Sequence, residues 1–227
     1  MLAVSFARPM SRTEQWSVDD LLPGHGERAV FVGQTGSGKT TLARVLLRSR
    51  PYVVVLDVKG TLHWAQDGYV LVRKLAKLPA DPRVAPRVVY RPEPRELRDE
   101  HVMDALAWWV YERQNTTFYV DEVYGYLEPF GGGLAPGLHA CLTRGRERGV
   151  EVWCSTQRPY RIPVSVLSES ENVYVFRLKV SEDRKRMEEV TGIDEALIAR
   201  LPKYHFYYAP QEDFDYYGPI TLRLGGA

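Results

Sequence analysis

The sequence predicts an α/β fold with a mainly parallel central sheet flanked by helices. Three observations lead to this prediction. β-prone runs alternate with helix-like stretches along most of the 227 residues. A glycine-rich loop, residues 33–40, lies between an apolar run and a helix-like stretch, and another apolar run ends in the adjacent carboxylates Asp121 and Glu122. Because parallel strands are usually covered by helices on both sides, we expect both faces of the sheet to be buried.

The glycine-rich loop reads Gly-Gln-Thr-Gly-Ser-Gly-Lys-Thr, a complete G-x-x-x-x-G-K-[ST] motif. It follows the apolar residues 29–32 and precedes the helix-like residues 41–47, the context that distinguishes a phosphate-binding loop from a chance match. Glycines let the backbone N–H groups turn inward at a helix N-terminus, where they bind polyphosphate. We expect Lys39 to reach the β- and γ-phosphates and the Thr40 hydroxyl to bind Mg²⁺. The predicted nucleotide-binding residues are Gly33, Gln34, Thr35, Gly36, Ser37, Gly38, Lys39, Thr40 and Thr41.

The remaining elements follow in order along the chain. After a polar lead-in, residues 1–28, and the phosphate-binding loop with its helix, residues 52–57 form a β-branched run of strand length. A proline-rich ordered loop, 79–94, surrounds a short strand at 88–90, and helical periodicity covers 95–114. Further on we expect strands at 116–121, 150–155 and 172–178, helices from 134 or 136 to about 148, at 181–191 and at 194–200, and a β-prone aromatic tail from 204 to 224.

No internal repeat or second domain is evident, so residues 1–227 are interpreted as one domain. It comprises the lead-in 1–28, a core 28–192, and a C-terminal helix with a β-prone tail, 193–227. The loop 131–133 has three consecutive glycines and permits large backbone changes. It is either a pore or interface element or a plain surface loop.

Asp121 and Glu122 end an apolar strand, and the carboxyl ends of strands are where open α/β sheets bind ligands. Asp121 is placed to hold Mg²⁺, and Glu122 to polarise a water for attack on the γ-phosphate. A small-molecule kinase has no use for the second acid. The alternative interpretation is that Glu122 is a solvated loop residue. The long separation between Lys39 and Asp121 leaves room for a strand between theirs, the arrangement of ATPases with a catalytic glutamate.

Two further groups bear on hydrolysis. The Gln157 amide, just after a buried strand, can donate to a γ-phosphate and accept from the attacking water. Alternatively, Thr156 and Gln157 only satisfy backbone groups of the loop. Arg144, Arg146 and Arg148 cannot all face one way on a helix. One of them could complete a neighbouring subunit's site as an arginine finger, or all could compensate the helix dipole.

Composition excludes several classes of protein. Hydrophobic residues make up 44% and charged residues 26%, as in globular proteins rather than disordered ones. No apolar stretch approaches the roughly 20 residues of a membrane span, and the N-terminus lacks the basic segment of a secretory signal. Two cysteines, Cys141 and Cys154, make no disulfide framework, which favours an intracellular setting. A net charge of +1 gives no indication of a nucleic-acid partner. The histidines show no metal-binding spacing: His25, His63, His101, His139 and His205.

Five segments resemble the HerA/FtsK superfamily of ring-forming, DNA-pumping P-loop ATPases. They are residues 33–40, 55–60 (Val-Leu-Asp-Val-Lys-Gly), 118–122 (Phe-Tyr-Val-Asp-Glu), 146–150 (Arg-Glu-Arg-Gly-Val) and 155–159 (Ser-Thr-Gln-Arg-Pro). The resemblance runs from about residue 28 to residue 192, and Ser-Thr-Gln-Arg-Pro is its most specific piece. For its small size, the chain looks most like the genome-packaging ATPases of double-stranded DNA viruses with an internal membrane.

The resemblance implies a RecA-like P-loop fold of the additional-strand, catalytic-glutamate type, with ATP and Mg²⁺ as cofactors. It assigns Mg²⁺ binding to Asp121, water activation to Glu122, γ-phosphate sensing to Gln157 and the trans finger to Arg146, leaving Arg144 and Arg148 open. Expected partners are double-stranded DNA without sequence preference, further copies in a ring (a hexamer), and a capsid-vertex or membrane protein. The expected location is the host cytoplasm and the packaging vertex of the virion, and the protein is not expected to be an integral membrane protein. Alternatives are a HerA-like or plasmid-transfer translocase and, more remotely, a small-molecule kinase.

Overall fold

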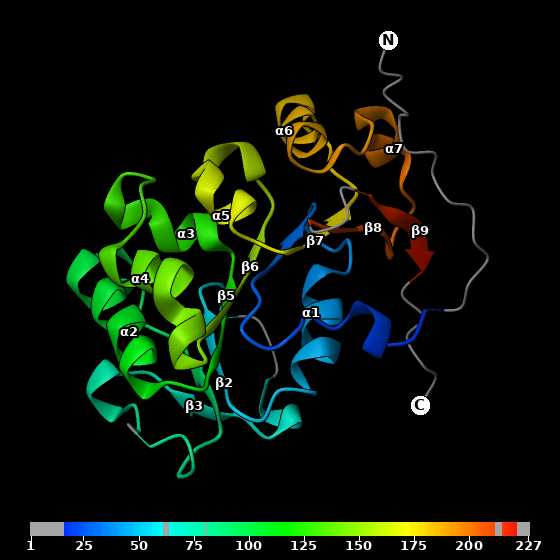
Figure 1. The fold of residues 1–227 in the computed structure, drawn as a ribbon. Coiled ribbons are helices and arrows are strands. Elements are labelled where there is room, and N and C mark those ends of the chain that lie inside the picture. The colour runs from blue at the N-terminus through cyan, green and yellow to red at the C-terminus, as the bar shows by residue number, and fades with distance from the viewer. Residues whose placement is uncertain (1–15, 61–63, 80, 212–214, 222–227) are drawn as a thin grey trace.

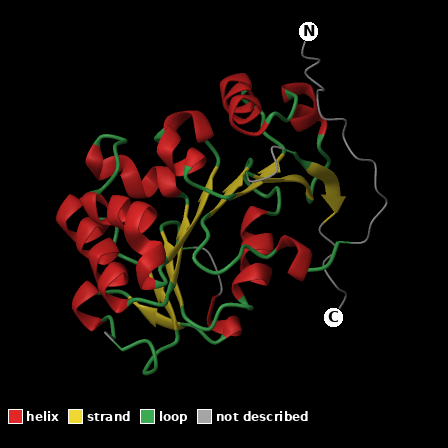
Figure 2. Ribbon diagram, viewed as in Figure 1, coloured by secondary structure: helices red, strands yellow, loops and turns green. Residues whose placement is uncertain are grey.

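A computed structural model describes residues 16–60, 64–79, 81–211 and 215–221. Their strands form one nine-stranded sheet in the order β3-β4-β2-β5-β6-β1-β7-β8-β9 (Figures 1 and 2). The strands are β1 Ala29–Val32, β2 Val53–Asp57, β3 Val70–Val72, β4 Arg87–Tyr90, β5 Thr117–Asp121, β6 Glu151–Thr156, β7 Asn172–Phe176, β8 His205–Pro210 and β9 Tyr217–Thr221. Every pairing from β3 to β7 is parallel, and β8 and β9 are antiparallel additions. The predicted, mainly parallel α/β sheet is confirmed.

Helices cover both faces of the sheet. They are α1 Lys39–Leu47, α2 Glu100–Arg113, α3 Val123–Leu127, α4 Pro136–Arg144, α5 Val164–Ser168, α6 Ser181–Thr191 and α7 Glu195–Arg200. In Figure 1, α1 lies on one face of the sheet, while α2, α3 and α4 lie on the other. The two-residue alternation of β1 serves both layers, because successive side chains point to opposite faces. Val30 and Val32 pack in the layer of α2 and α4, whereas Ala29 and Phe31 pack in the layer of α1.

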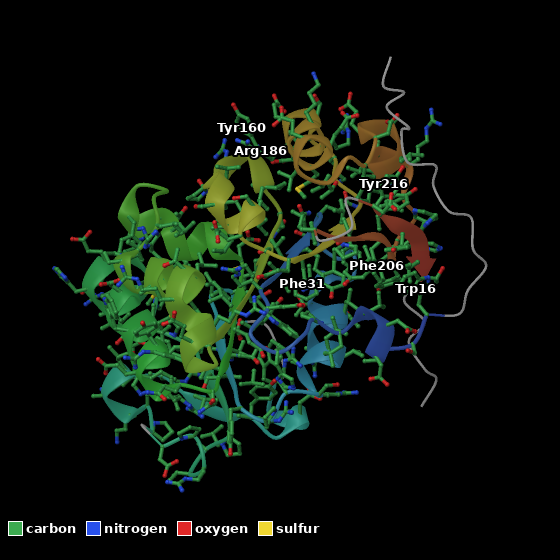
Figure 3. All side chains as sticks on the ribbon, viewed as in Figure 1. Trp16, Phe31, Tyr160, Arg186, Phe206 and Tyr216 are labelled. Carbon is green, nitrogen blue, oxygen red and sulfur yellow. The ribbon has the colours of Figure 1, made fainter. Side chains whose placement is uncertain are left out.

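Aromatic side chains fill the layer on the α1 side. Phe31 stacks on Tyr174 with ring centroids 4.7 Å apart, and Tyr174 stacks on Tyr208 at 5.0 Å. Figure 3 shows Phe31, Phe206 and Trp16 on this side of the molecule. The β-prone aromatic tail predicted from the sequence therefore packs into the core through β8.

The structure departs from the predicted elements in a few places. The stretch 95–114 splits into a 3-10 turn, Glu96–Arg98, and α2, because the Asp99 side chain accepts from the backbone N–H groups of His101 and Val102 and caps the helix. The helix expected to reach residue 148 ends as α4 and continues as a 3-10 turn, Gly145–Arg148. The short elements β3, α3 and α5 were not predicted. Residues 1–15 of the lead-in, 222–227 of the tail and His63 lie outside the described residues.

The strand order places the predicted site residues at one edge of the sheet. β6 lies between β1 and β5, so the predicted intervening strand is present. In register, Val32 of β1 pairs with Thr156 of β6, and Asp57 of β2 pairs with Asp121 of β5. We call this edge, where the parallel strands end, the carboxyl edge, and the opposite edge, where they begin, the amino edge.

Candidate active site

The phosphate-binding loop is tethered to two strands at the carboxyl edge. The amide of Gly33 donates to the carbonyl of Thr156 at 3.1 Å, and the amide of Gln34 donates to the carbonyl of Arg177 at 2.9 Å. A Cβ at Gly33 would lie 2.5 Å from the Cβ of Phe176, so only glycine permits this approach. The loop therefore begins at a position set by β6 and β7.

The far end of the loop turns into α1. Gly36 and Gly38 adopt φ values of 72° and 116°, which other residues rarely reach. Gly38 is the residue just before α1 and provides no side-chain cap, so the first N–H groups of the helix are left for an anion. Two buried oxygens of the loop, Gln34 Oε1 and Ser37 Oγ, have no hydrogen-bond partner among the described residues. Unsatisfied buried polar atoms beside free helix N–H groups fit a cradle for phosphate.

Lys39 lies buried under this loop, with 7% of its surface exposed. Its Nζ donates to the carbonyls of Gly33 at 2.6 Å and Gln34 at 3.0 Å. Burial lowers the pKa of Lys39 to about 8, against the opposing attraction of the Glu122 carboxylate. The charge of Lys59 acts in the same direction as burial. An ammonium group without a directly bonded carboxylate is suited to an anionic ligand.

Asp121 forms the acidic side of the site. Its Oδ1 accepts from Thr40 Oγ1 at 3.3 Å, from Ser155 Oγ at 3.1 Å and from the Tyr119 hydroxyl at 3.2 Å. Burial raises the pKa of Asp121. The described residues contain no group of three or more histidine, cysteine or acidic side chains able to hold a metal by themselves. The oxygens of Thr40 and Asp121 fit Mg²⁺, which takes few protein ligands and completes its shell with phosphate and water.

Glu122 occupies a sharp turn between β5 and α3. Its φ of 72° and ψ of 74° place a non-glycine residue in the left-handed region, at a cost of about 1–3 kcal/mol. The turn is held by its amide, which donates to Ser155 Oγ at 3.1 Å. The Glu122 carboxylate meets Thr156 Oγ1 at 3.2 Å, Gln157 Nε2 at 2.8 Å and Lys59 Nζ at 3.1 Å. Glu122 is buried in the site, which excludes the interpretation as a solvated loop residue.

Gln157 connects the carboxylate to the phosphate-binding loop. Its Nε2 donates to Glu122, and its Oε1 accepts from the Thr35 hydroxyl. Thr156 satisfies a backbone group of the loop, as the alternative considered from sequence has it, because its hydroxyl accepts from the amide of Arg158 at 3.1 Å. The same hydroxyl also donates to Glu122. The structure thus brings the predicted residues of three separate loops into contact.

Several residues of this cluster were not predicted from the sequence. Lys59, Ser155 and Tyr119 contact Glu122 or Asp121 directly. The available signal was weak: Lys59 follows the end of a strand, in the matched segment 55–60, and strand ends collect ligand-binding side chains. Asp57, at the end of β2, is fully buried and accepts hydrogen bonds from Arg91 and from the amide of Gly60.

The three candidate finger arginines lie at the amino edge, in and before the turn that leads into β6. All three are exposed. β6 separates them from the carboxyl edge by about 17 Å at the usual rise of a strand. The stem of Arg146 packs on Gly26, where a Cβ would lie 2.9 Å from the Arg146 Cγ, and the Arg148 guanidinium lies 4.5 Å from the ring centroid of Tyr111. These arginines therefore lie far from the phosphate-binding loop of their own chain.

Comparison with known proteins was made with this geometry in hand. No protein-family model matches the chain. The chain is 26% identical over 200 residues to the DNA packaging ATPase P9 of Enterobacteria phage PRD1, a match that covers 82% of this chain and 83% of P9. This similarity confirms the resemblance to viral packaging ATPases predicted from the motifs.

The fold matches the solved structures of a genome packaging NTPase and of VirB4. The genome packaging NTPase B204 of Sulfolobus turreted icosahedral virus 2, in complex with AMPPCP, superposes with a TM-score of 0.68 at 17% identity, covering 86% of this chain and 98% of B204. VirB4 of Thermoanaerobacter pseudethanolicus superposes with a TM-score of 0.62 at 9% identity, covering 87% of this chain and 90% of VirB4. At such identities the matches show the fold, and they confirm its predicted type.

Proposed function

We propose that this protein is an ATP-hydrolysing motor that moves double-stranded DNA during viral genome packaging. The observation that carries the proposal is that Lys39, Asp121, Glu122 and Gln157 gather at one sheet edge, on a chain similar to packaging ATPase P9. The complex of the similarly folded B204 with AMPPCP supports the proposal that this chain binds a nucleotide. Residues 1–227 would act as one ATPase domain built on the single sheet.

Each residue has a distinct task in hydrolysis. The loop N–H groups and Lys39 bind the phosphates, while Thr40 and Asp121 hold Mg²⁺. A Mg²⁺ ion held by Thr40 and Asp121 would neutralise charge on the phosphate oxygens. Glu122 takes the proton of the attacking water, and Gln157 orients that water and detects the γ-phosphate. This pairing of a base with a water-orienting amide favours an ATPase over a kinase, because a kinase must keep water from its phosphate.

The site is completed by a second copy of the chain. In a closed ring with head-to-tail contacts, here a hexamer, the amino edge of one subunit faces the carboxyl edge of the next. Arg146 then reaches the neighbour's γ-phosphate. Its stem is already packed on Gly26, while the guanidinium of Arg148 is occupied by Tyr111. An arginine finger in trans contributes about 10³–10⁵-fold to turnover.

The remaining partners follow from the same proposal. Duplex DNA passes through the ring and is gripped through its phosphates, so no sequence preference is expected. The loop 131–133 faces the pore or the subunit interface. The motor works in the host cytoplasm and docks on a capsid-vertex or membrane protein at the packaging vertex. Among the described residues, no helix is both long and apolar enough to cross a membrane.

The test measures ATP turnover with and without long duplex DNA, together with the mass of the particle. Duplex DNA is expected to stimulate the wild type, which sediments as a ring. Arg146→Ala is expected to lower turnover about 10³-fold while retaining ATP binding. Arg144→Ala and Arg148→Ala are matched controls and should stay within about tenfold of wild type.

A mixing experiment separates a trans finger from a local defect. Lys39→Ala removes the phosphate-binding lysine but keeps the finger, and Arg146→Ala does the reverse. Mixed rings contain interfaces in which an intact Lys39 meets an intact Arg146, so turnover returns on mixing the two inactive proteins. Failure to complement, in a monomer indifferent to DNA, would overturn the proposed ring motor.

A further inference from the structure

The Glu122 carboxylate is fully occupied by hydrogen-bond donors. Its Oε1 accepts from Thr156 Oγ1 at 3.2 Å and from the amide of Gln157 at 3.3 Å. Its Oε2 accepts from Gln157 Nε2 at 2.8 Å and from Lys59 Nζ at 3.1 Å. A carboxylate offers about four lone-pair sites. A water can therefore donate to Glu122 only after one of these four donors leaves.

The four donors differ in their freedom to leave. Thr156 is fully buried at the end of β6, and the Gln157 amide belongs to the backbone that follows it. The Gln157 side chain is tied at its other end to Thr35. Lys59 has 40% of its side chain exposed and is attached by a flexible four-carbon stem. Lys59 is the donor that can withdraw with the least change elsewhere.

The backbone that carries Lys59 is firmly anchored. Asp57 Oδ1 accepts from the amide of Gly60 at 2.8 Å, which closes the turn beneath Lys59. Asp57 Oδ2 accepts from Arg91 Nε at 3.0 Å and Nη2 at 2.7 Å, and Asp57 is fully buried. Gly60 has a φ of 66°, which favours glycine in this turn. An anchored backbone with an exposed, flexible side chain suits a residue that exchanges hydrogen-bond partners.

Lys59 also lies within electrostatic reach of the phosphate-binding lysine. Its charge contributes to the lowered pKa of Lys39, and it stabilises the ionised form of Asp121. A phosphate bound by Lys39 is therefore within the field of Lys59 as well. The γ-phosphate offers Lys59 an anionic partner to replace Glu122.

We propose that Lys59 is a positioning residue that blocks Glu122 in the nucleotide-free site and releases it by moving to the γ-phosphate. The inference rests on the proposed ATPase site and not on DNA translocation. A nucleoside triphosphate then frees its own catalytic base, whereas a diphosphate leaves the Lys59–Glu122 ion pair intact. Because Lys59 leaves only when a γ-phosphate is present, Glu122 does not activate water before the γ-phosphate is bound.

The test compares the affinities of ATPγS and ADP for the full chain, without DNA, by fluorescence titration. Lys59→Ala is expected to weaken ATPγS binding about tenfold and to leave ADP binding within about twofold. Lys59→Arg should recover most of the ATPγS affinity, because it restores a cation of similar reach. Lys74→Ala, at an exposed lysine before a 3-10 turn, is the matched control and should change neither affinity.

A double-mutant cycle tests the block itself. Glu122→Gln removes the carboxylate that pairs with Lys59. It should therefore tighten ATPγS binding more in the wild-type background than in the Lys59→Ala background. Equal weakening of ATPγS and ADP by Lys59→Ala would indicate a general structural effect and overturn the proposal. An unchanged ratio of the two affinities would overturn it too. Because these titrations contain no DNA, a wild type that ignores DNA would refute the translocase while leaving the Lys59 result readable.

Discussion

Each of the two sheet edges holds a buried cation, Arg50 at the amino edge and Lys39 at the carboxyl edge, and the two cations have different partners. At the amino edge, Arg50 and Glu151 are 3% and 4% exposed and pair at 2.7 Å, and Glu151 also accepts from Thr117 at 3.0 Å. Arg50 further donates to the carbonyl of Gly24 at 3.0 Å. At the carboxyl edge, Lys39 is bonded to two carbonyls. Charges that satisfy one another serve the fold, whereas a buried cation without a bonded carboxylate is kept available for a ligand.

The largest effect that would sharpen this comparison is expected at Glu122. Glu122→Gln keeps the size of the side chain but removes the base, so turnover should fall about 10²–10⁴-fold. The free energy of unfolding should fall by only about 1–3 kcal/mol, because the amide oxygen still accepts hydrogen bonds while the NH2 group loses those of the second carboxylate oxygen. Phosphate release and chemical denaturation measure the two quantities. Glu128→Gln, at an exposed glutamate just after α3, is the control. Undiminished turnover in Glu122→Gln would mean that another group is the base.

The converse result is expected at the amino edge. Arg50→Ala leaves Glu151 buried and without its cation, which should cost about 3–5 kcal/mol of unfolding free energy. For a chain of this size, each kcal/mol corresponds to about 2–4 °C in Tm. The affinity of the folded protein for ATP should stay within about twofold, because Arg50 lies at the opposite edge. Arg83→Ala breaks the exposed pair of Arg83 with Asp81 and is the control, because solvent screens this pair and its loss should leave Tm nearly unchanged. A loss of ATP affinity as large as the loss of stability would contradict the division between edges.

The two edges also differ in how far they were predictable from sequence. Residues 33–40 form one uninterrupted motif, and Asp121 and Glu122 are adjacent. Spacing within each motif was therefore enough to assign both to a site. Lys59 and Ser155 join that site only through the order of β2, β5 and β6, which local spacing does not encode.

Local backbone geometry set a second limit. The positive φ of Glu122 was not foreseeable, because glutamate rarely adopts it, and the five residues of α3 are too few to show periodicity. The sheet edge at which Arg146 lies could be inferred from the sequence, because Arg146 precedes β6 whereas the phosphate-binding loop follows β1. In a parallel sheet, these two positions lie at opposite edges.

The smallest predicted effect concerns the pH dependence of Lys39. Its pKa of about 8 in the folded chain lies below the 10.5 of an ordinary lysine, chiefly because of burial. Above pH 8 the free protein loses this proton, while bound phosphate favours the charged form. ATP affinity should therefore fall about tenfold between pH 8 and pH 9 or slightly above, relative to Lys39→Arg, whose guanidinium stays charged. Parallel pH profiles for the two proteins would show that Lys39 does not titrate in this range.

Stability of the nucleotide-free protein should change in the opposite direction. Between pH 8 and pH 10.5 the unfolded chain holds the Lys39 proton and the folded chain does not, so the free energy of unfolding rises with pH. Lys39→Met lacks this contribution and serves as the reference in denaturant titrations. The same proton thus destabilises the folded chain and strengthens ATP binding. This exchange of stability for ligand binding distinguishes Lys39 from the Arg50–Glu151 pair at the amino edge. A wild type that follows Lys39→Met at every pH would remove that distinction.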